Sequence, residues 1–219
     1  MNLDPGFGWT YNDYRKAMLL FQTANYHISS FQDFLEKPEV KHLILRHDVD
    51  FSLEAAHKMA RIDHELGITS SFYFRVHASN YNLFSSKGIT LVGDFISMGH
   101  EVALHLESGV DLLQNREKWE TLDGQISAFE SLLGIKIAGF SAHEPARLGG
   151  LETSDDAKAR WNLSYHAYEE RFTKEIKYLS DSSGRWREGP MTNFIDQFNC
   201  LQVLIHPIWW YEKSPLENY

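Results

Sequence analysis

Seven short apolar segments recur along residues 41–205 and constrain the fold more than any other feature of the chain. Apolar segments of four to eight residues favour buried strands, whereas the segments between several of them have apolar residues spaced for one helical face. This alternation is typical of a parallel α/β barrel. We expect strands at 41–45, 69–76, 101–106, 135–140, 163–166, 176–179 and 200–205, and helices at 52–66, 87–98, 115–133 and 193–198.

Length and charge limit the class of protein. The 219 residues, 43% of them hydrophobic, can bury one sizeable core, so we expect one domain over 1–219 with residues 1–40 as a helical cap. The net charge of −9 argues against nucleic acid as the main partner. No window approaches 18 continuous apolar residues and no signal peptide is evident at Met1, which predicts a cytoplasmic protein without membrane insertion. The oligomeric state is not predicted.

The first predicted strand ends in a cluster of ligand-type residues, Arg46-His47-Asp48-Val49-Asp50. Strand side chains alternate, so Asp48 and Asp50 point to the same side. Two neighbouring carboxylates repel each other unless a proton or a divalent cation lies between them, which makes this pair a candidate functional site. The alternative is that Asp50 merely caps a helix beginning near Ser52.

Other predicted strands also end in polar residues. The carboxyl ends of the strands of a parallel barrel meet at one end of it, so these residues are expected to share a site. Imidazole and carboxylate groups without thiolates suit zinc, iron or manganese, and zinc is the ion we expect. The residues are His105 and Glu107, then His143 and Glu144, then Asp181, and finally His206.

The order and spacing of these motifs resemble the NodB-homology polysaccharide deacetylases, carbohydrate esterase family 4, over roughly residues 41–210. Some of them further resemble a divergent bacterial branch associated with surface-polysaccharide biosynthesis, namely Arg46 to Asp50, Tyr178 to Trp186 and His206 to Trp210. The family motifs are matched by Asp48-Val49-Asp50, by Gly99-His100-Glu101-Val102-Ala103-Leu104-His105, by the strand tip near His143, by Asp181 and by Leu204-Ile205-His206-Pro207.

This resemblance implies a distorted (β/α)7 barrel of the NodB-homology type that removes acetyl groups from sugars with a divalent metal. Position by position, it implies that Asp48 is the general base and that Asp50 and His105 are metal ligands. His206 would be the general acid. Asp181 would orient a catalytic group, although Asp181-Ser182-Ser183-Gly184 is equally good turn chemistry.

The chain departs from the family pattern at the metal site. The family's second motif has another histidine four residues after the first, and Gly109 occupies that position here. Glu107, two residues from His105 on the same side of an extended strand, is one substitute ligand, and His143 is the other. Arg147 is the candidate for the arginine of the family's third motif.

Four residues are candidates for binding substrate: Arg147, Trp186, Arg187 and Trp209. The tryptophans either form an aromatic platform for a sugar ring or are simply buried at the barrel rim. Arg185 and Arg187, beside Trp186, either hold a phosphate or carboxylate of the substrate or are solvated in a turn.

We therefore expect a metal-dependent hydrolase that removes an acetyl group from an N-acetylated sugar or glycan precursor in surface polysaccharide (lipopolysaccharide or O-antigen) biosynthesis. One alternative is a hydrolase of a non-sugar amide that uses the same chemistry. Another is a non-catalytic glycan-binding barrel, because loss of the histidine at Gly109 could have ended turnover.

Overall fold

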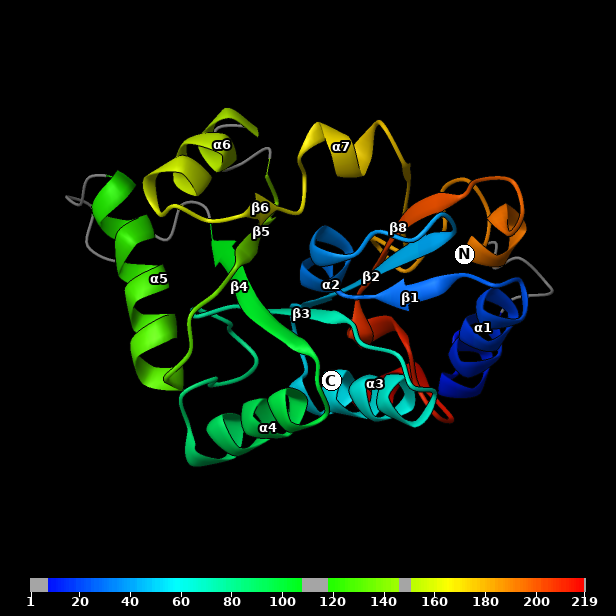
Figure 1. The fold of residues 1–219 in the computed structure, drawn as a ribbon. Coiled ribbons are helices and arrows are strands. Elements are labelled where there is room, and N and C mark those ends of the chain that lie inside the picture. The colour runs from blue at the N-terminus through cyan, green and yellow to red at the C-terminus, as the bar shows by residue number, and fades with distance from the viewer. Residues whose placement is uncertain (1–7, 108–117, 146–150, 219) are drawn as a thin grey trace.

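A curled sheet of parallel strands forms the centre of the computed structural model, which describes residues 8–107, 118–145 and 151–218 (Figure 1). The strands pair in the order β6-β5-β4-β3-β2-β8-β7, and β1 also pairs with β2. No pairing joins the edge strands β6 and β7 among the described residues, so the barrel is open there. The strands are β1 His27–Ser29, β2 His42–Val49, β3 Ser71–Phe74, β4 Glu101–Glu107, β5 Gly139–His143, β6 Tyr165–His166, β7 Lys177–Ser180 and β8 Cys200–Ile205.

Helices cover the outside of this sheet, as Figure 1 shows for α1, α3, α4 and α5. The arrangement confirms the predicted α/β fold with a distorted (β/α)7 barrel. Among the described helices, none is both long and apolar enough to cross a membrane. The helices are α1 Tyr11–Thr23, α2 Phe31–Glu36, α3 Leu53–Glu65, α4 Ser86–Ser97, α5 Lys118–Leu133, α6 Leu151–Arg160 and α7 Glu170–Thr173, with 3-10 turns η1 Met191–Phe194, η2 Pro207–Trp209 and η3 Pro215–Asn218.

Strand β2 is the centre of the sheet, and all eight of its residues are buried. It pairs with β8 along one edge, while β1 and then β3 share the other edge. The strand continues past the predicted end at residue 45, because Arg46 to Val49 are paired with β3. Arg46 and His47 are paired on both sides, and Asp48 and Val49 with β3 alone, so the strand pairing fixes the backbone that leads into the site.

The end of the barrel opposite the predicted site is filled by side chains. Phe31 of α2 is fully buried and packs in one cluster with Ile44, Tyr73 and Tyr165. Its ring stacks on that of Tyr165, with centroids 4.8 Å apart and planes 12° from parallel. Burying a phenylalanine of this kind contributes about 1.5–3 kcal/mol. These side chains therefore close the interior at the end opposite the carboxyl ends of the strands.

Two elements differ from the sequence-based expectation. Strand β5 begins at Gly139 rather than at residue 135, and it carries Ser141 and His143 into the sheet. A side chain at position 139 would lie only 2.3 Å from the ring of Tyr165, so the close approach of β6 requires glycine there. The helix expected at 193–198 is the short 3-10 turn η1. Strand β1 and helices α6 and α7 were not predicted, because they are short or lack a clear apolar period.

Candidate metal centre

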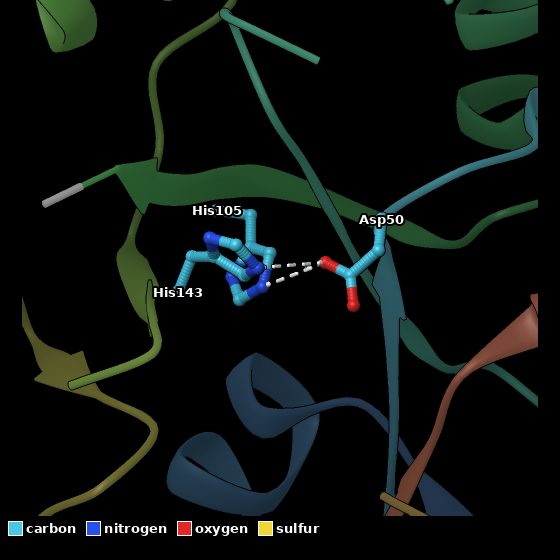
Figure 2. A group of neighbouring side chains, drawn as sticks. All are labelled: Asp50, His105 and His143. Atoms are coloured by element: carbon cyan, nitrogen blue, oxygen red, sulfur yellow. Dashed lines mark ion pairs between the residues drawn. The ribbon is translucent and has the colours of Figure 1, made fainter. Parts of the chain in front are cut away.

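Three metal-ligand side chains converge at the carboxyl ends of β2, β4 and β5 (Figure 2). Oδ1 of Asp50 lies 3.3 Å from Nε2 of His105 and 3.7 Å from Nε2 of His143. All three donor atoms lie within 4.8 Å of one another. The sequence predicted that the strand tips would gather, and the structure brings these three together.

Hydrogen bonds on the far side of each imidazole fix which nitrogen faces the centre. Nδ1 of His105 lies 3.1 Å from the carbonyl oxygen of Ser141, and Nδ1 of His143 lies 3.3 Å from the carboxylate of Glu107. Each Nδ1 therefore donates its proton to an oxygen, which leaves the lone pair of Nε2 directed at Asp50. Such outer hydrogen bonds are the usual support for metal-bound histidines.

The donor set fits a divalent transition metal. Oδ1 of Asp50 is a buried carboxylate oxygen with no hydrogen-bond partner among the described residues. Metal bonds of about 2.0–2.2 Å at tetrahedral angles place ligand atoms roughly 3.3–3.6 Å apart, close to the two distances from this oxygen. One carboxylate and two imidazoles would hold such an ion and leave positions open for water and substrate.

The capping alternative for Asp50 is wrong, because another residue caps the following helix. The side chain of Ser52 accepts a hydrogen bond of 3.1 Å from the backbone N–H of Ala55, at the start of α3. Burial opposes ionisation of Asp50, but the neighbouring imidazoles, His105 first among them, hold the pKa of this carboxyl well below its ordinary value. Asp50 is thus an anion available for another role.

Asp48, two residues before Asp50, is held by a buried arginine. Nε and Nη2 of Arg46 donate to its two carboxylate oxygens at 2.9 and 2.7 Å. Arg46 is itself buried, donates to Ser141, and lies over the ring of Tyr168 at 4.4 Å. Burial opposes ionisation, but the charge of Arg46 outweighs it and keeps the pKa of Asp48 below its ordinary value. The pair fixes an ionised carboxylate beside the three donors.

His206 and Asp181 form a hydrogen-bonded pair next to Asp50. Nδ1 of His206 donates to the fully buried Asp181 at 2.6 Å, and Nε2 of His206 lies 3.9 Å from Oδ2 of Asp50. The indole N–H of Trp210 donates to the other oxygen of Asp181 at 2.9 Å. Burial disfavours the imidazolium, but the hydrogen bond and charge of Asp181 raise the pKa of His206 to about 9. His206 is therefore protonated at neutral pH.

Glu107 faces the site but its carboxylate has other partners. It accepts hydrogen bonds from Nε of Arg75 and from Nδ1 of His143. Its backbone N–H and C=O are both bound by the side-chain amide of Gln125, at 2.9 and 3.0 Å. Arg75 also donates to the carbonyl oxygen of Asp50 at 3.3 Å. Glu107 thus lies behind His143, hydrogen-bonded to it and to Arg75.

Three of the four candidate substrate residues lie within the described part of the chain. Trp186 and Arg187 line a cavity that also includes Ser180 and Ser182, in the segment that follows β7. Trp209 is partly buried and its ring packs against Gly184 at 3.3 Å from the position of a Cβ. Arg147 lies outside the described residues, and so does Gly109, which occupies the position of the second histidine in the family motif.

Sequence reasoning missed three supporting residues, namely Arg46, Arg75 and Ser141. Strand alternation places Arg46 on the same side as Asp48, so this contact was readable from the motif. The contacts of Arg75 and Ser141 depend on neighbouring strands brought together by the fold, and no local pattern indicates them.

Comparisons with known proteins support the fold. Three similar solved structures are a mutant of BA3943 from Bacillus anthracis, called a CE4 family pseudoenzyme with restored activity, peptidoglycan deacetylase PdaC from Bacillus subtilis, and deacetylase PplD from Streptococcus pyogenes with acetate. Their TM-scores are 0.52, 0.53 and 0.52 at 11%, 14% and 14% identity. The matches cover 78%, 82% and 94% of this chain, and 58%, 80% and 84% of the other chains.

The chain spans 58% of the BA3943 mutant, the first of these structures. No family model matches the sequence, and no curated protein matches it either. At identities this low the similarity establishes the fold, which is that of the family 4 carbohydrate esterases. It agrees with the resemblance carried by the sequence motifs, while function has to be argued from the site.

Proposed function

We propose that this protein is a metal-dependent deacetylase that acts on an N-acetylated sugar or glycan precursor. One observation carries the proposal: the Asp50, His105 and His143 donors lie between an ionised carboxylate, Asp48, and a protonated imidazole, His206. A binding protein would need the donors alone. The carboxylate of Asp48 and the imidazolium of His206 beside these donors are the additional groups that hydrolysis requires.

We assign His143, rather than Glu107, as the third ligand. The Nε2 lone pair of His143 faces Asp50, whereas the carboxylate of Glu107 is engaged by Arg75 and by His143 itself. His143→Ala should therefore abolish binding of zinc, while Glu107→Gln should weaken it by about 10–100-fold, the usual effect of losing an outer hydrogen bond to a ligand. Zinc titration of both variants tests this assignment. Equal affinities in the two variants would refute it.

The chemistry follows from the positions of the side chains. A divalent ion at the three donors would polarise the acetyl carbonyl and lower the pKa of water. Asp48 is placed to accept the proton of the attacking water, with Arg46 fixing its orientation. His206 is placed to protonate the departing amine, and its bond to Asp181 holds the Nε2–H toward the centre.

The biological setting extends this proposal. The motif resemblance supports a role in surface-polysaccharide biosynthesis. The proposed protein is cytoplasmic, acts on a nucleotide-linked or lipid-linked precursor, and has zinc as its native ion. Cell fractionation tests the location. Deletion of the gene tests the role in surface-polysaccharide biosynthesis. It should abolish the surface polysaccharide or change its acetylation.

Release of acetate is the direct test of activity. Zinc-loaded protein should release acetate from N-acetylated sugars, and Asp48→Asn should reduce the rate by about 10²–10⁴-fold while metal content stays at the wild-type level. Full activity of Asp48→Asn would contradict the assigned base. Binding of metal and sugar without acetate release would identify a non-catalytic barrel instead.

A further inference from the structure

The cavity lined by Trp186 and Arg187 lies along β7 and the segment that follows it. Its volume is about 220 Å³, smaller than the roughly 300–1,000 Å³ pockets that enclose drug-sized ligands, so it suits one sugar ring rather than a chain. Its wall has hydroxyl, indole and charged groups and few aliphatic ones. The side chains that the argument uses are Tyr178, Ser180, Ser182, Trp186, Arg187 and Glu188.

This cavity adjoins the catalytic groups through two routes. Ser180 immediately precedes Asp181, the partner of His206. On the same strand, the ring of Tyr178 lies 6.5 Å from that of Tyr168, which in turn lies against the guanidinium of Arg46. Strand β7 is also an edge strand at the open side of the barrel.

The wall of the cavity has one uncompensated positive charge. Glu188 is paired with Lys177 at 2.7 Å, which neutralises its carboxylate. Arg187 is exposed, and no ion pair or hydrogen bond of its side chain is found within the described part of the chain. A lone arginine at a cavity is notable in a chain of net charge −9, because the overall field repels anions.

Neutral groups beside Arg187 suit the rest of a sugar. Ser180 and Ser182 have their hydroxyl oxygens 2.6 Å apart, so one of the two hydroxyls donates to the other and the second is left to bind a ligand. The ring of Trp186 is held by stacking on Trp9, with centroids 6.2 Å apart and planes 11° from parallel. A fixed indole and a hydroxyl pair are suited to the apolar face and the hydroxyl groups of a pyranose.

We propose that this cavity binds an anionic group, a carboxylate or a phosphate, on the sugar substrate or on the sugar next to it, with Arg187 as the residue that recognises the charge. The inference rests on the proposed function, because it defines the substrate class of that same site as acidic acetylated sugars. The planar fork of a guanidinium matches the two oxygens of either anion. The two sources differ in charge and shape, so separate probes distinguish them.

Calorimetric titration of the full chain with three probes tests the proposal: N-acetylglucosamine, its 1-phosphate, and the corresponding uronic acid with a carboxylate at C6. At least one charged probe should bind about tenfold or more tightly than the neutral sugar. Arg187→Gln should remove this preference and Arg187→Lys should retain part of it. Arg185→Gln is the matched control, since Arg185 is also exposed but does not line the cavity.

Equal affinity for the neutral and charged sugars would overturn the proposal, as would failure of all three to bind. An equal loss of preference in Arg185→Gln would also overturn it, because the effect would then reflect general charge. Acetate release, measured in the same samples, separates this inference from the proposed function. Arginine-dependent selectivity without acetate release would refute only the deacetylase, and acetate release without selectivity would refute only the anion site.

Discussion

The two faces of strand β2 carry two buried polar clusters of different character. On the barrel side, Arg46, Asp48 and Asp50 are charged, and Asp50 directs an unpaired oxygen at two histidine lone pairs. On the helix side, His47 lies among Tyr14, Asp63 and Ser70, and these groups hydrogen-bond mainly to one another. Successive side chains of β2 point to opposite faces of the sheet, and this separates the charged cluster from the hydrogen-bonded one.

The helix-side cluster is expected to be largely neutral. The ring of His47 stacks flat on Phe72, with centroids 4.3 Å apart, and burial lowers its pKa well below the ordinary value. Burial also raises the pKa of Asp63 to about 7, against hydrogen bonds from Tyr14 and Ser70. A set of weakly charged groups, hydrogen-bonded to one another except at Nδ1 of His47, stabilises the packing of α1 and α3 on the sheet, whereas the barrel-side set has donors available for a ligand.

The largest effect is expected from breaking the charge pair on the barrel side. Arg46→Met leaves Asp48 buried without its partner and should lower the free energy of unfolding by about 3–5 kcal/mol. Urea denaturation measures it. The matched control is Arg46→Met combined with Asp48→Leu, which removes both charges and should recover much of the loss. If Arg46→Met were as stable as the double variant, the charge of Asp48 would not depend on Arg46, and the prediction would be wrong.

Loss of the proposed acid should affect the rate and leave the helix side untouched. His206→Gln removes the ionisable group and should reduce acetate release by about 10²–10⁴-fold. Steady-state kinetics gives the value. An unchanged kcat would show that another group protonates the leaving amine.

Breaking the helix-side cluster should affect stability alone. Tyr14→Phe removes the hydroxyl bonded to Asp63 at 2.7 Å but keeps the ring that contacts Trp210. The expected loss is about 1–3 kcal/mol of unfolding free energy, with metal affinity and kcat unchanged. Denaturation and zinc titration together test this contrast between the faces. Reduced zinc affinity in Tyr14→Phe would show that the two clusters are coupled.

The last contrast concerns pH and isolates Asp63. Its pKa is about 7 in the folded protein and near 3.8 in an unfolded chain, so between these values the folded state holds a proton that the unfolded state has released. The contribution of Asp63 to stability is therefore full below pH 3.8 and falls as the pH rises through 7. Asp63→Asn should remove this dependence.

Unfolding curves of wild type and Asp63→Asn from pH 4.5 to 7.5 measure this pH dependence of the free energy of unfolding. The stability of wild type relative to the variant should decline with rising pH. The other groups that face Asp63, namely Arg15, Tyr14, His47 and Ser70, are the same in both proteins. A difference that stays constant across this range would contradict the raised pKa.

Much of the fold could be predicted because apolar strands and helical periods are local signals. The same holds for the strand tips, since alternation puts Asp48 and Asp50 together and parallel strands bring His105 near them. The choice between Glu107 and His143 could not be made from local signals. It depends on β5 extending to residue 143, on the register that places His143 opposite Glu107, and on Arg75 from a third strand.

The metal content of the purified protein tests the central claim most directly. Elemental mass spectrometry, after purification without chelator and reloading with zinc, should find about one ion per chain in wild type and in Asp63→Asn. Asp50→Ala and His143→Ala should contain none. A wild-type protein that cannot be loaded, or an Asp50→Ala variant that keeps its ion, would contradict a metal centre on the barrel side of β2.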